Sequence, residues 1–504
     1  MRTILPTLSA ALLAATLPVQ AQDPDGKAGP TGSGASNAAV DNGPGTANSV
    51  ADLNVRVVRQ WHRAAGVNYN DIWGWTAPDG REFAYVGEVG GIWFVETTDP
   101  QNMRTVGQWS APRSTWRDYA NLGGYVYAVS EGHRGIRILD MRNPDQPRDV
   151  GYVEVNAITN THNITSDPAT GHLYLSGTNQ GVMIYDASQN PEAPRYVGNW
   201  NITYTHDCCV LRGRAFLSNG STRRTRIMDA SNPANLIEIS NFQSPAGYNH
   251  NVWVSDDESL LCVTDEIARR WNSPHMTVWD ISNPRSPVKR GDYDLGTIVH
   301  NVFILGRTAY MSHYTDGVHV VDLTDPAQPT RIASYDTSTV SGGYNGCWGV
   351  HPFADHGLVY ASDMQNGLYV LEIQAGHMNR YGAGTPGTNG GVPRATFQAA
   401  TPRVGATGLR LSVDNLEPNA SAWLIVGWAQ GNVNVAGVDI HVDPQASYAT
   451  DFAADAQGHA DVALPIPADA NLGNQRVYMQ IVARDSQAAN GFSASRGMWF
   501  GIAQ

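Results

Sequence analysis

The sequence predicts an all-β protein: a seven-bladed β-propeller closed by an N-terminal strand and followed by a C-terminal β-sandwich domain. Two observations carry this prediction. A segment that ends in an apolar run and an acidic residue occurs seven times, at intervals of 42 to 51 residues. The chain also contains 51 Gly, 28 Pro, 14 Trp and 21 Tyr, a composition typical of β proteins with many turns.

The repeat has a constant order of features. An apolar run ends in one acid, as in GVMIYD and GVHVVD, and a Pro-containing turn such as ISNPRSP follows most of the acids. The seven acids are Glu96, Asp140, Asp186, Asp229, Asp280, Asp322 and Glu372. Asp, Asn, Ser and Pro favour tight turns, so a further short strand is expected after each turn.

Each copy is expected to contain four short strands. In the third copy these are HNITSD, HLYLSG, GVMIYD and RYVGNW, with turn residues between them. Four-stranded units in seven copies favour a propeller. A solenoid is the competing architecture, but solenoid repeats are shorter and need capped ends.

The two ends of the array complement each other. The seventh copy stops at LYVLEI (368–373) and lacks a fourth strand, whereas a spare strand, NVRVVRQW (54–61), precedes the first copy. We expect the spare strand to complete the last blade. This closure would remove two open sheet edges, which otherwise favour aggregation.

The N-terminus has the features of an export signal. Residues 1–21 contain Arg2, an apolar stretch and the small-x-small sequence Val19-Gln20-Ala21, and predict a cleaved signal peptide. Residues 22–52 are rich in Gly, Ala, Asn, Ser and Pro and predict a disordered lead-in. No later apolar run is long enough to span a membrane. We therefore expect a protein that is secreted or in the cell envelope, in the periplasm or at the cell surface.

The composition changes after the repeats. We expect the propeller to occupy residues 53–374, followed by a Gly/Pro-rich linker at 375–392 and the β-sandwich domain at 393–504. The last segment contains strand-like runs such as SAWLIVGWA and QRVYMQIVARD, separated by polar turns. Nothing in it indicates catalysis.

Charge and cysteine content restrict the partners. The net charge is −13, with 33 Lys and Arg against 46 Asp and Glu and no basic block, which argues against nucleic acid and anionic membrane surfaces. Four cysteines in so long a chain do not form a disulfide framework, and buried free thiols are the favoured interpretation.

The repeats resemble those of LVIVD-repeat proteins within the choice-of-anchor B family. GVHVVDLTDPAQPTRIASY matches the family repeat best, and the resemblance covers about residues 54–373. It implies a secreted or surface propeller and no particular activity. The family name refers to C-terminal sorting signals, and this sequence shows neither a terminal hydrophobic anchor nor a cell-wall sorting motif.

A second motif, His followed by Asn or Asp, recurs before the first strand of several copies, as in YNHNVWV and IVHNVFI. The matching positions in the seven copies are Asn70, Arg117, His162, His206, His250, His300 and His351. The residues that follow them are Asp71, Asp118, Asn163, Asp207, Asn251, Asn301 and Pro352. We expect both sets to surround one mouth of the central channel, with Asn70, Asp71, Arg117, Asp118 and Asp207 as its polar ring.

The loop between the second and third strands lies on the same face. It carries Glu88, Glu131, Asp265, Glu266, His313 and Asp363. Of these, Glu131, Asp265 and His313 are expected near the histidines.

Three interpretations of the motif compete. Asn and Asp cap exposed backbone groups at turns, and this is favoured for Asn163, Asp207, Asn251 and Asn301. The histidines and acids fit a divalent transition metal such as Zn, Cu or Fe. Alternatively, the face binds a small ligand or a peptide.

No spacing in the sequence indicates a known catalytic motif. The favoured function is therefore a binding or interaction scaffold, with a small ligand, a peptide or an envelope protein as partner. The alternative is a metal-dependent enzyme, a hydrolase or an oxidase, that uses the histidines of the channel mouth.

Overall fold

The computed structural model describes residues 52–504 apart from 65, 156, 157, 159, 246, 268–274, 339, 341 and 342. The predicted signal peptide and all but the last residue of the predicted lead-in lie outside the described residues. Regular structure within them consists of strands and three short 3₁₀ turns, η1 (Pro100–Asn102), η2 (Thr388–Gly390) and η3 (Ala470–Leu472). The all-β prediction is confirmed, and none of the described residues forms a helix that could cross a membrane.

Seven sheets in this part of the chain have four antiparallel strands each. Their first strands are β2 (Tyr69–Thr76), β6 (Arg117–Leu122), β10 (Asn163–Asp167), β14 (Asp207–Leu211), β18 (Val252–Val254), β22 (Val302–Leu305) and β26 (Cys347–His351). The second strands are β3 (Glu82–Glu88), β7 (Tyr125–Ser130), β11 (His172–Thr178), β15 (Arg214–Ser218), β19 (Leu260–Thr264), β23 (Thr308–Ser312) and β27 (Val359–Asp363).

The outer two strands follow in chain order in six of these sheets, and in the seventh the fourth strand is the N-terminal β1. The third strands are β4 (Gly91–Glu96), β8 (Ile136–Asp140), β12 (Gly181–Asp186), β16 (Arg224–Asp229), β20 (Met276–Asp280), β24 (Val318–Asp322) and β28 (Gly367–Ile373). The fourth strands are β5 (Arg104–Ser110), β9 (Arg148–Val153), β13 (Arg195–Trp200), β17 (Ile237–Gln243), β21 (Val288–Tyr293), β25 (Thr330–Tyr335) and β1 (Val55–Trp61).

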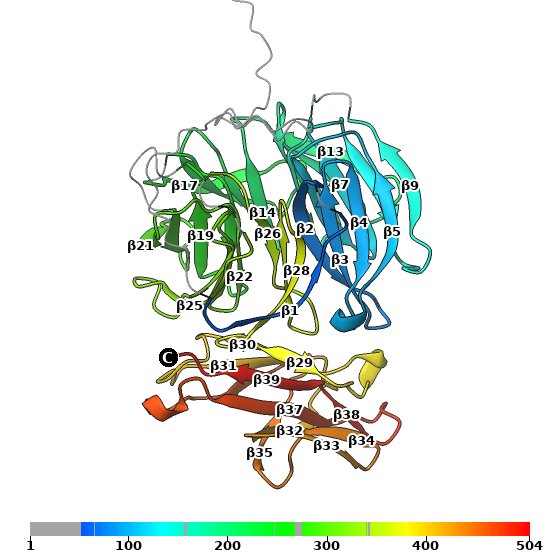
Figure 1. Cartoon of the computed structure of the whole chain (residues 1–504), viewed down its shortest axis with the longest axis vertical. Helices are drawn as coiled ribbons and strands as arrows, with labels where there is room; N and C mark the ends of the chain where they lie inside the picture. Colours follow the sequence, from blue (N-terminus) through cyan, green and yellow to red (C-terminus); the bar gives the residue numbers. More distant parts are fainter. Residues whose placement is uncertain are drawn as a thin grey trace, which may run out of the picture.

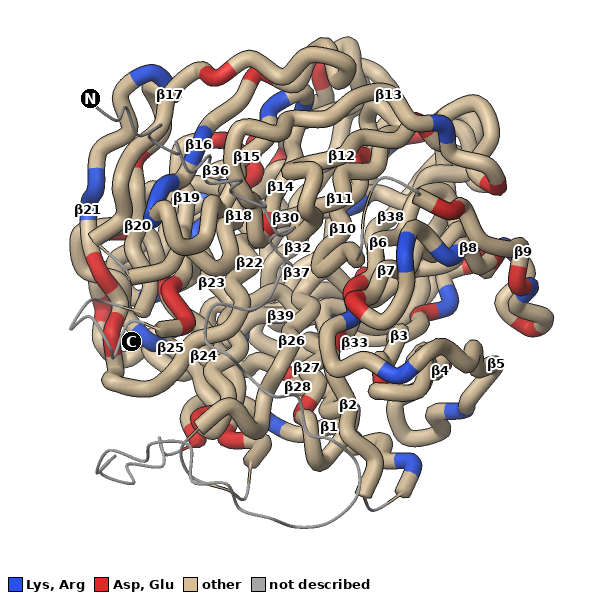
Figure 2. Tube along the Cα trace, turned by 90° about the horizontal axis from the view of Figure 1, so that it is seen from above, with Lys and Arg blue, Asp and Glu red and all other residues tan. Residues whose placement is uncertain are grey.

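The sheets form a ring. Each first strand lies against the first strands of the two neighbouring sheets, and the ring closes where β26 meets β2. Seen from above, the body is round, and most of its charged residues lie toward the periphery (Figure 2). This is a β-propeller with the first strands innermost, around a central channel.

Strand β1 completes the seventh sheet. It pairs antiparallel with β28, from Val55 opposite Ile373 to Trp61 opposite Leu368. Leu53, just before β1, also bridges to Ser334 in the sixth sheet. The N-terminal strand thus joins the last part of the propeller, as the sequence predicted.

The repeated acid explains the turn between the third and fourth strands. The carboxylates of Asp186, Asp280 and Asp322 each accept the backbone N–H two residues later, at 2.8 to 3.0 Å. The next Asn or Asp does the same at the second corner, as Asn283 does with the N–H of Arg285. Such Asx turns fix the chain reversal locally, which is why the pattern recurs in the sequence.

The propeller core lies between neighbouring sheets. For example, Tyr174 and Ile184 of the third sheet share one buried cluster with Val210, Leu217 and Met228 of the fourth. Both faces of an inner strand are therefore covered. This explains why the second strands are buried along almost their whole length and read as continuous apolar runs.

A second β domain follows the propeller and lies beneath it in Figure 1. Its six-stranded sheet contains β29 (Asn379–Tyr381), β39 (Gly497–Gly501), β37 (Arg476–Arg484), β32 (Ser421–Gly427), β35 (Ser447–Ala453) and β38 (Phe492–Ala494). The smaller sheets contain β30 (Arg394–Gln398), β31 (Arg410–Asp414) and β36 (Ala460–Ala463), and the hairpin of β33 (Gln430–Val435) and β34 (Val438–Val442). Residues of the six-stranded and three-stranded sheets, including Leu411, Leu424 and Ile481, share one core.

Segment 375–392 differs from the expected linker. It supplies β29, which pairs with β39 at the edge of the six-stranded sheet. The second domain is also bonded to the propeller, because the hydroxyls of Thr401 and Thr308 lie 3.1 Å apart and Arg403 donates to Asp322 at 2.9 Å. Composition alone suggested flexibility, whereas pairing and docking hold this segment in place.

Candidate functional site

Four histidines lie at one mouth of the central channel. His162, His206, His250 and His300 each come one or two residues before an inner strand. Successive imidazole centroids are 4.4, 4.2 and 4.8 Å apart, so the rings form a continuous arc. The arc forms because residues at equivalent positions of the repeats lie at similar distances from the axis of the closed ring. It lies at the end of the first strands opposite the second domain, which docks on the loops that follow them.

Each histidine of the arc is oriented through Nδ1. The Nδ1 atoms of His206, His250 and His300 bond the backbone carbonyls of His250, His300 and Trp348, at 3.1, 3.0 and 2.6 Å. The Nδ1 atom of His162 lies 2.8 Å from Glu131 Oε1. A carbonyl oxygen can only accept, so Nδ1 carries the proton. In the neutral ring Nε2 then holds the lone pair, the form in which imidazole binds metals.

Trp348 of the seventh sheet continues the arc after His300, and the prediction of His351 is wrong. The indole ring of Trp348 lies 4.6 Å from that of His300, and its carbonyl ends the chain of bonds. Strand β26 begins at Cys347, so Trp348 lies at its start, whereas His351 is its last residue, three positions further along. His351 instead packs 4.9 Å from Trp73, and burial lowers the pKa of His351 to about 3.

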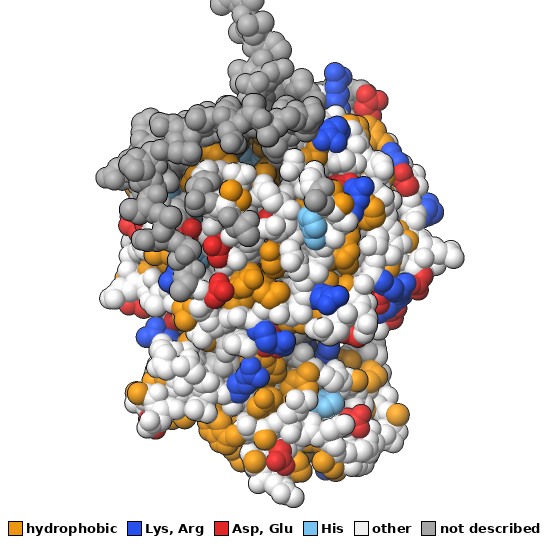
Figure 3. Space-filling model, in the orientation of Figure 1, with side chains coloured by type: hydrophobic (Ala, Val, Ile, Leu, Met, Phe, Trp, Pro, Cys, Tyr) orange, Lys and Arg blue, Asp and Glu red, His pale blue; other side chains and the backbone are white. Residues whose placement is uncertain are grey.

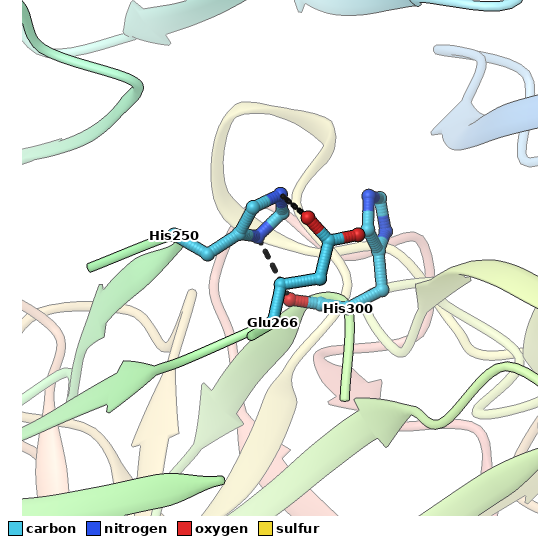
Figure 4. A group of neighbouring side chains, drawn as sticks. All are labelled: His250, Glu266 and His300. Atoms are coloured by element: carbon cyan, nitrogen blue, oxygen red, sulfur yellow. Dashed lines mark hydrogen bonds and ion pairs between the residues drawn. The ribbon is translucent and has the colours of Figure 1, made fainter. Parts of the chain in front are cut away.

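A carboxylate joins the two last histidines of the arc. One ligand atom from each of His250, Glu266 and His300 lies within 4.8 Å of the others, and all three residues are buried (Figure 4). His250 Nε2 is 3.4 Å from Glu266 Oε2. The hydroxyl of Tyr314 donates to the other carboxylate oxygen, Glu266 Oε1, and so fixes its direction.

The loop residues predicted beside the histidines separate into two groups. Glu131 does contact the arc, through His162. In the part of the chain that the structure describes, the Asp265 carboxylate accepts the backbone N–H groups of Gly247 and Ile267. Asp265 thus stabilises a turn, while the adjacent Glu266 belongs to the histidine cluster, and the sequence alone does not distinguish the two roles.

His313 is also outside the mouth, contrary to the prediction. Its ring stacks on that of His319 at 4.1 Å, and its Nδ1 lies 3.1 Å from the Thr297 hydroxyl. Burial is the main cause that lowers the pKa of His313 well below its usual value. The residue is part of a packed contact between the fifth and sixth sheets.

A second ring lies one residue deeper in the channel, at the Asn or Asp of the motif. Asn251 donates to Asp207 Oδ2 at 2.6 Å and accepts the N–H of Val302 at 3.0 Å. Asp118 Oδ2 accepts the N–H of Ile164 at 2.7 Å. These bonds connect neighbouring sheets, which supports the capping interpretation for this ring.

Three members of the deeper ring are buried carboxyls. Burial is the main cause that raises the pKa of Asp71 to about 6 and that of Asp207 to about 7. Burial and the nearby Asp71 raise the pKa of Asp118 well above its usual value. The seventh position, Gly349, has no side chain, and a Cβ there would lie 2.7 Å from Asp71 Oδ1.

The remaining two predicted ring residues bond to the loop that leads into the second sheet. The amide of Asn70 reaches the carbonyl of Ser114 at 3.4 Å. The guanidinium of Arg117 donates to the carbonyl of Pro112 at 2.8 Å and lies 5.7 Å from the Trp109 ring. Burial lowers the pKa of Arg117. Both residues border the arc without adding a metal ligand.

The two rings enclose a small space. It measures about 20 Å³ and is lined by the four histidines, Trp348 and residues of the deeper ring. This is enough for one water-sized species. At the other end of the channel, Trp253 packs 4.6 Å from Phe303 and 5.9 Å from Phe353, and Trp73 packs 6.0 Å from Phe303. The aromatic cluster fills that end of the channel.

Solved structures with a similar chain path are propellers of low identity. The structure of U3-55K is 12% identical over 64% of this chain and 99% of that chain, with a TM-score of 0.46. The Cps50 (Swd1) β-propeller domain of Myceliophteria thermophila is 10% identical over 63% and 98%, with a TM-score of 0.48. The RRP9 WD40 repeats are 12% identical over 65% and 98%, with a TM-score of 0.46.

No curated protein matches the sequence. The LVIVD repeat family, in contrast, matches two adjacent segments, residues 246–295 and 296–337. These segments contain His250, Glu266 and His300. The three residues whose ligand atoms lie close together therefore all belong to repeats that match this family. The propeller of this chain is therefore built, at least in its fifth and sixth sheets, from LVIVD repeats.

Proposed function

We propose that this protein is an exported binding protein whose propeller holds one divalent transition-metal ion at the channel mouth. His250 Nε2, His300 Nε2 and the Glu266 carboxylate would be the ligands. One observation carries the proposal: these three buried side chains, from two neighbouring repeats, bring ligand atoms within 4.8 Å of one another. Imidazole and carboxylate together suit Zn, Cu and Fe.

The hydrogen bonds around the cluster support a cation. Nδ1 of His250 is committed to a carbonyl, so the neutral ring turns the Nε2 lone pair toward the Glu266 carboxylate at 3.4 Å. A lone pair and a carboxylate at this distance repel unless a proton or a metal ion lies between them. The bonds from Nδ1 and from Tyr314 hold the ligands in direction, as supporting bonds do in known metal sites.

Three protein ligands leave a coordination position open, which is typical of catalytic rather than structural zinc sites. This observation favours the alternative, a metal-dependent hydrolase or oxidase, as a second candidate. In either case the bound ion would recruit a further ligand through the mouth. The class of partner that fits is a small ligand, a peptide or an envelope protein with an exposed metal-binding group.

The place of the protein follows from the sequence and is part of the proposal. The predicted signal peptide supports export to the periplasm or the cell surface. Resemblance to the choice-of-anchor B family agrees with a surface location. The net charge of −13 agrees with attraction of cations and with a partner other than nucleic acid.

Metal titration of the mature chain tests the proposal. The protein is purified without an affinity tag, stripped with chelator and titrated by calorimetry with Zn²⁺, Cu²⁺ and Fe²⁺. We expect one equivalent to bind, and we expect His300→Ala and Glu266→Gln to weaken binding at least about 100-fold, more than loss of a supporting bond does.

The matched control is His459→Gln, which removes an exposed histidine of the second domain. It should bind metal as the unaltered chain does. Unchanged affinity in His300→Ala, or no binding of any of the three metals, would exclude this site.

A further inference from the structure

A second cavity lies at the opposite end of the molecule, where the propeller meets the second domain. It measures about 60 Å³ and is lined by the loops after β22 and β26, by the segment around β29, and by β30. Figure 1 shows β30 directly beneath the propeller, and Figure 3 shows basic side chains along the boundary between the two bodies. The cavity exists only because the second domain is docked.

An arginine of this cavity has no carboxylate partner. The Arg380 guanidinium donates to two backbone carbonyls, of Asp355 at 3.3 Å and Ala395 at 2.7 Å. No carboxylate among the described residues lies within ion-pair distance of it. The carboxylate of Asp355, whose backbone carbonyl Arg380 bonds, is shared by Arg394 at 3.3 Å and Arg496 at 3.6 Å. Three cations therefore surround one carboxylate.

Arg380 remains charged in this setting. Burial, with a smaller effect of Arg394, lowers the pKa of Arg380 to about 10, so the group is still a cation at neutral pH. Glu82 also faces this region, but burial raises its pKa to about 7, which weakens it as a counter-ion. A largely buried cation without an anion is costly, and an anion from outside would relieve that cost.

Tyr310 and His377 of the cavity are already bonded to other groups of the protein. Tyr310 donates its hydroxyl to His377 Nδ1, and His377 Nε2 donates to the carbonyl of Gly357. Burial lowers the pKa of His377 to about 4, so this ring adds no charge. Arg394, Thr308 and Thr396 also line the cavity, and the apolar part of its wall is chiefly Phe353, Met378 and Phe397.

We infer that this interdomain cavity binds a small monocarboxylate with a short aliphatic chain. The carboxylate would pair with the unused donors of Arg380, which suit a planar two-oxygen anion, and the chain would lie against the apolar walls. The volume has room for about four to six non-hydrogen atoms, the range from acetate to butyrate. The site is independent of the metal proposed at the channel mouth.

Binding of butyrate to the mature full chain tests this inference. We expect saturable binding by calorimetry and a rise in melting temperature of about 3 °C or more at saturation, since the ligand binds only the docked state. Butyramide, which has the same shape and no charge, should bind at least tenfold more weakly.

Two variants distinguish a loss of butyrate binding in the cavity from a loss of overall protein stability. Arg380→Gln should abolish butyrate binding, but it also removes a bridge between the domains. Thr396→Leu therefore provides a second test, because it fills the cavity from β30 and leaves Arg380 in place. The matched control is Arg496→Gln, which removes another cation of the same interface outside the cavity and should bind butyrate normally.

Three results would overturn the inference. Butyramide could bind as well as butyrate, Thr396→Leu could bind butyrate with unchanged affinity, or acetate, propionate and butyrate could all fail to saturate at concentrations up to about 100 mM. Each of these can occur whether or not the channel mouth binds metal.

Discussion

Replacement of Asp71 by asparagine should stabilise the protein above neutral pH and leave it nearly unchanged in acid. Asp71 is buried in the deeper channel ring and is hydrogen-bonded to Asp118, so one of the two carboxyls must hold a proton. The amide of the introduced asparagine would supply that donor permanently while its oxygen still accepts the N–H of Ile72. The same ring already uses this arrangement, because Asn251 donates to Asp207.

The expected size follows from the pKa of Asp71, which burial raises from 3.8 to about 6. A folded pKa above the unfolded value means that the folded state holds its proton longer. The stabilisation is therefore complete below about pH 4 and is lost as pH rises through about 6. The loss amounts to at most about 3 kcal/mol at pH 8, and Asp71→Asn avoids it.

Thermal unfolding of both proteins at pH 4.5 and pH 8 measures this effect. We expect the variant to melt several degrees higher than the unaltered chain at pH 8 and within about 1 °C of it at pH 4.5. Asp207→Asn is the control: its new N–H₂ would face the N–H₂ of Asn251, whose oxygen is held by Val302, so its gain should be smaller. An equal gain of Asp71→Asn at both pH values, or a loss at pH 8, would refute the buried-charge argument.

Three further predictions concern the fold. Deletion through residue 62 removes β1 and the half-buried Val55, Val57 and Trp61. It should lower the free energy of unfolding by roughly 3–6 kcal/mol and cause aggregation that light scattering detects. Deletion through residue 51 should do neither. Limited proteolysis should leave 375–392 intact, because β29 is paired and docked; early cleavage there would contradict the docking. The four buried cysteines should react with a thiol reagent only in denaturant, and fast labelling of the native protein would contradict their burial.

Much of the propeller could be predicted because its determinants are local in the chain. The Asp that ends five of the third strands accepts the backbone N–H two residues later, so a turn that recurs in the structure gives a residue that recurs in the sequence. Apolar runs of strand length mark the buried second and third strands in the same way. The closing strand could also be predicted, because an extra strand precedes the first copy and the seventh copy lacks its fourth strand.

The site depended on contacts that no local pattern records. The start of β26 at Cys347 places Trp348 rather than His351 beside His300, and the sequence around His351 does not reveal where the strand begins. Asp265 and Glu266 are adjacent acids in the turn after β19, yet the first accepts backbone N–H groups and the second faces two histidines.

The sequence by itself determined the all-β repeat architecture and the strand that completes the seventh sheet. It also determined that the repeated histidines lie at a similar distance from the channel axis. Only the tertiary structure decided which side chains share a point in space, and that the segment at 375–392 docks as a strand. The physical reason is that turns and strands are set by neighbouring residues in the chain, whereas side-chain convergence depends on register and packing between distant segments.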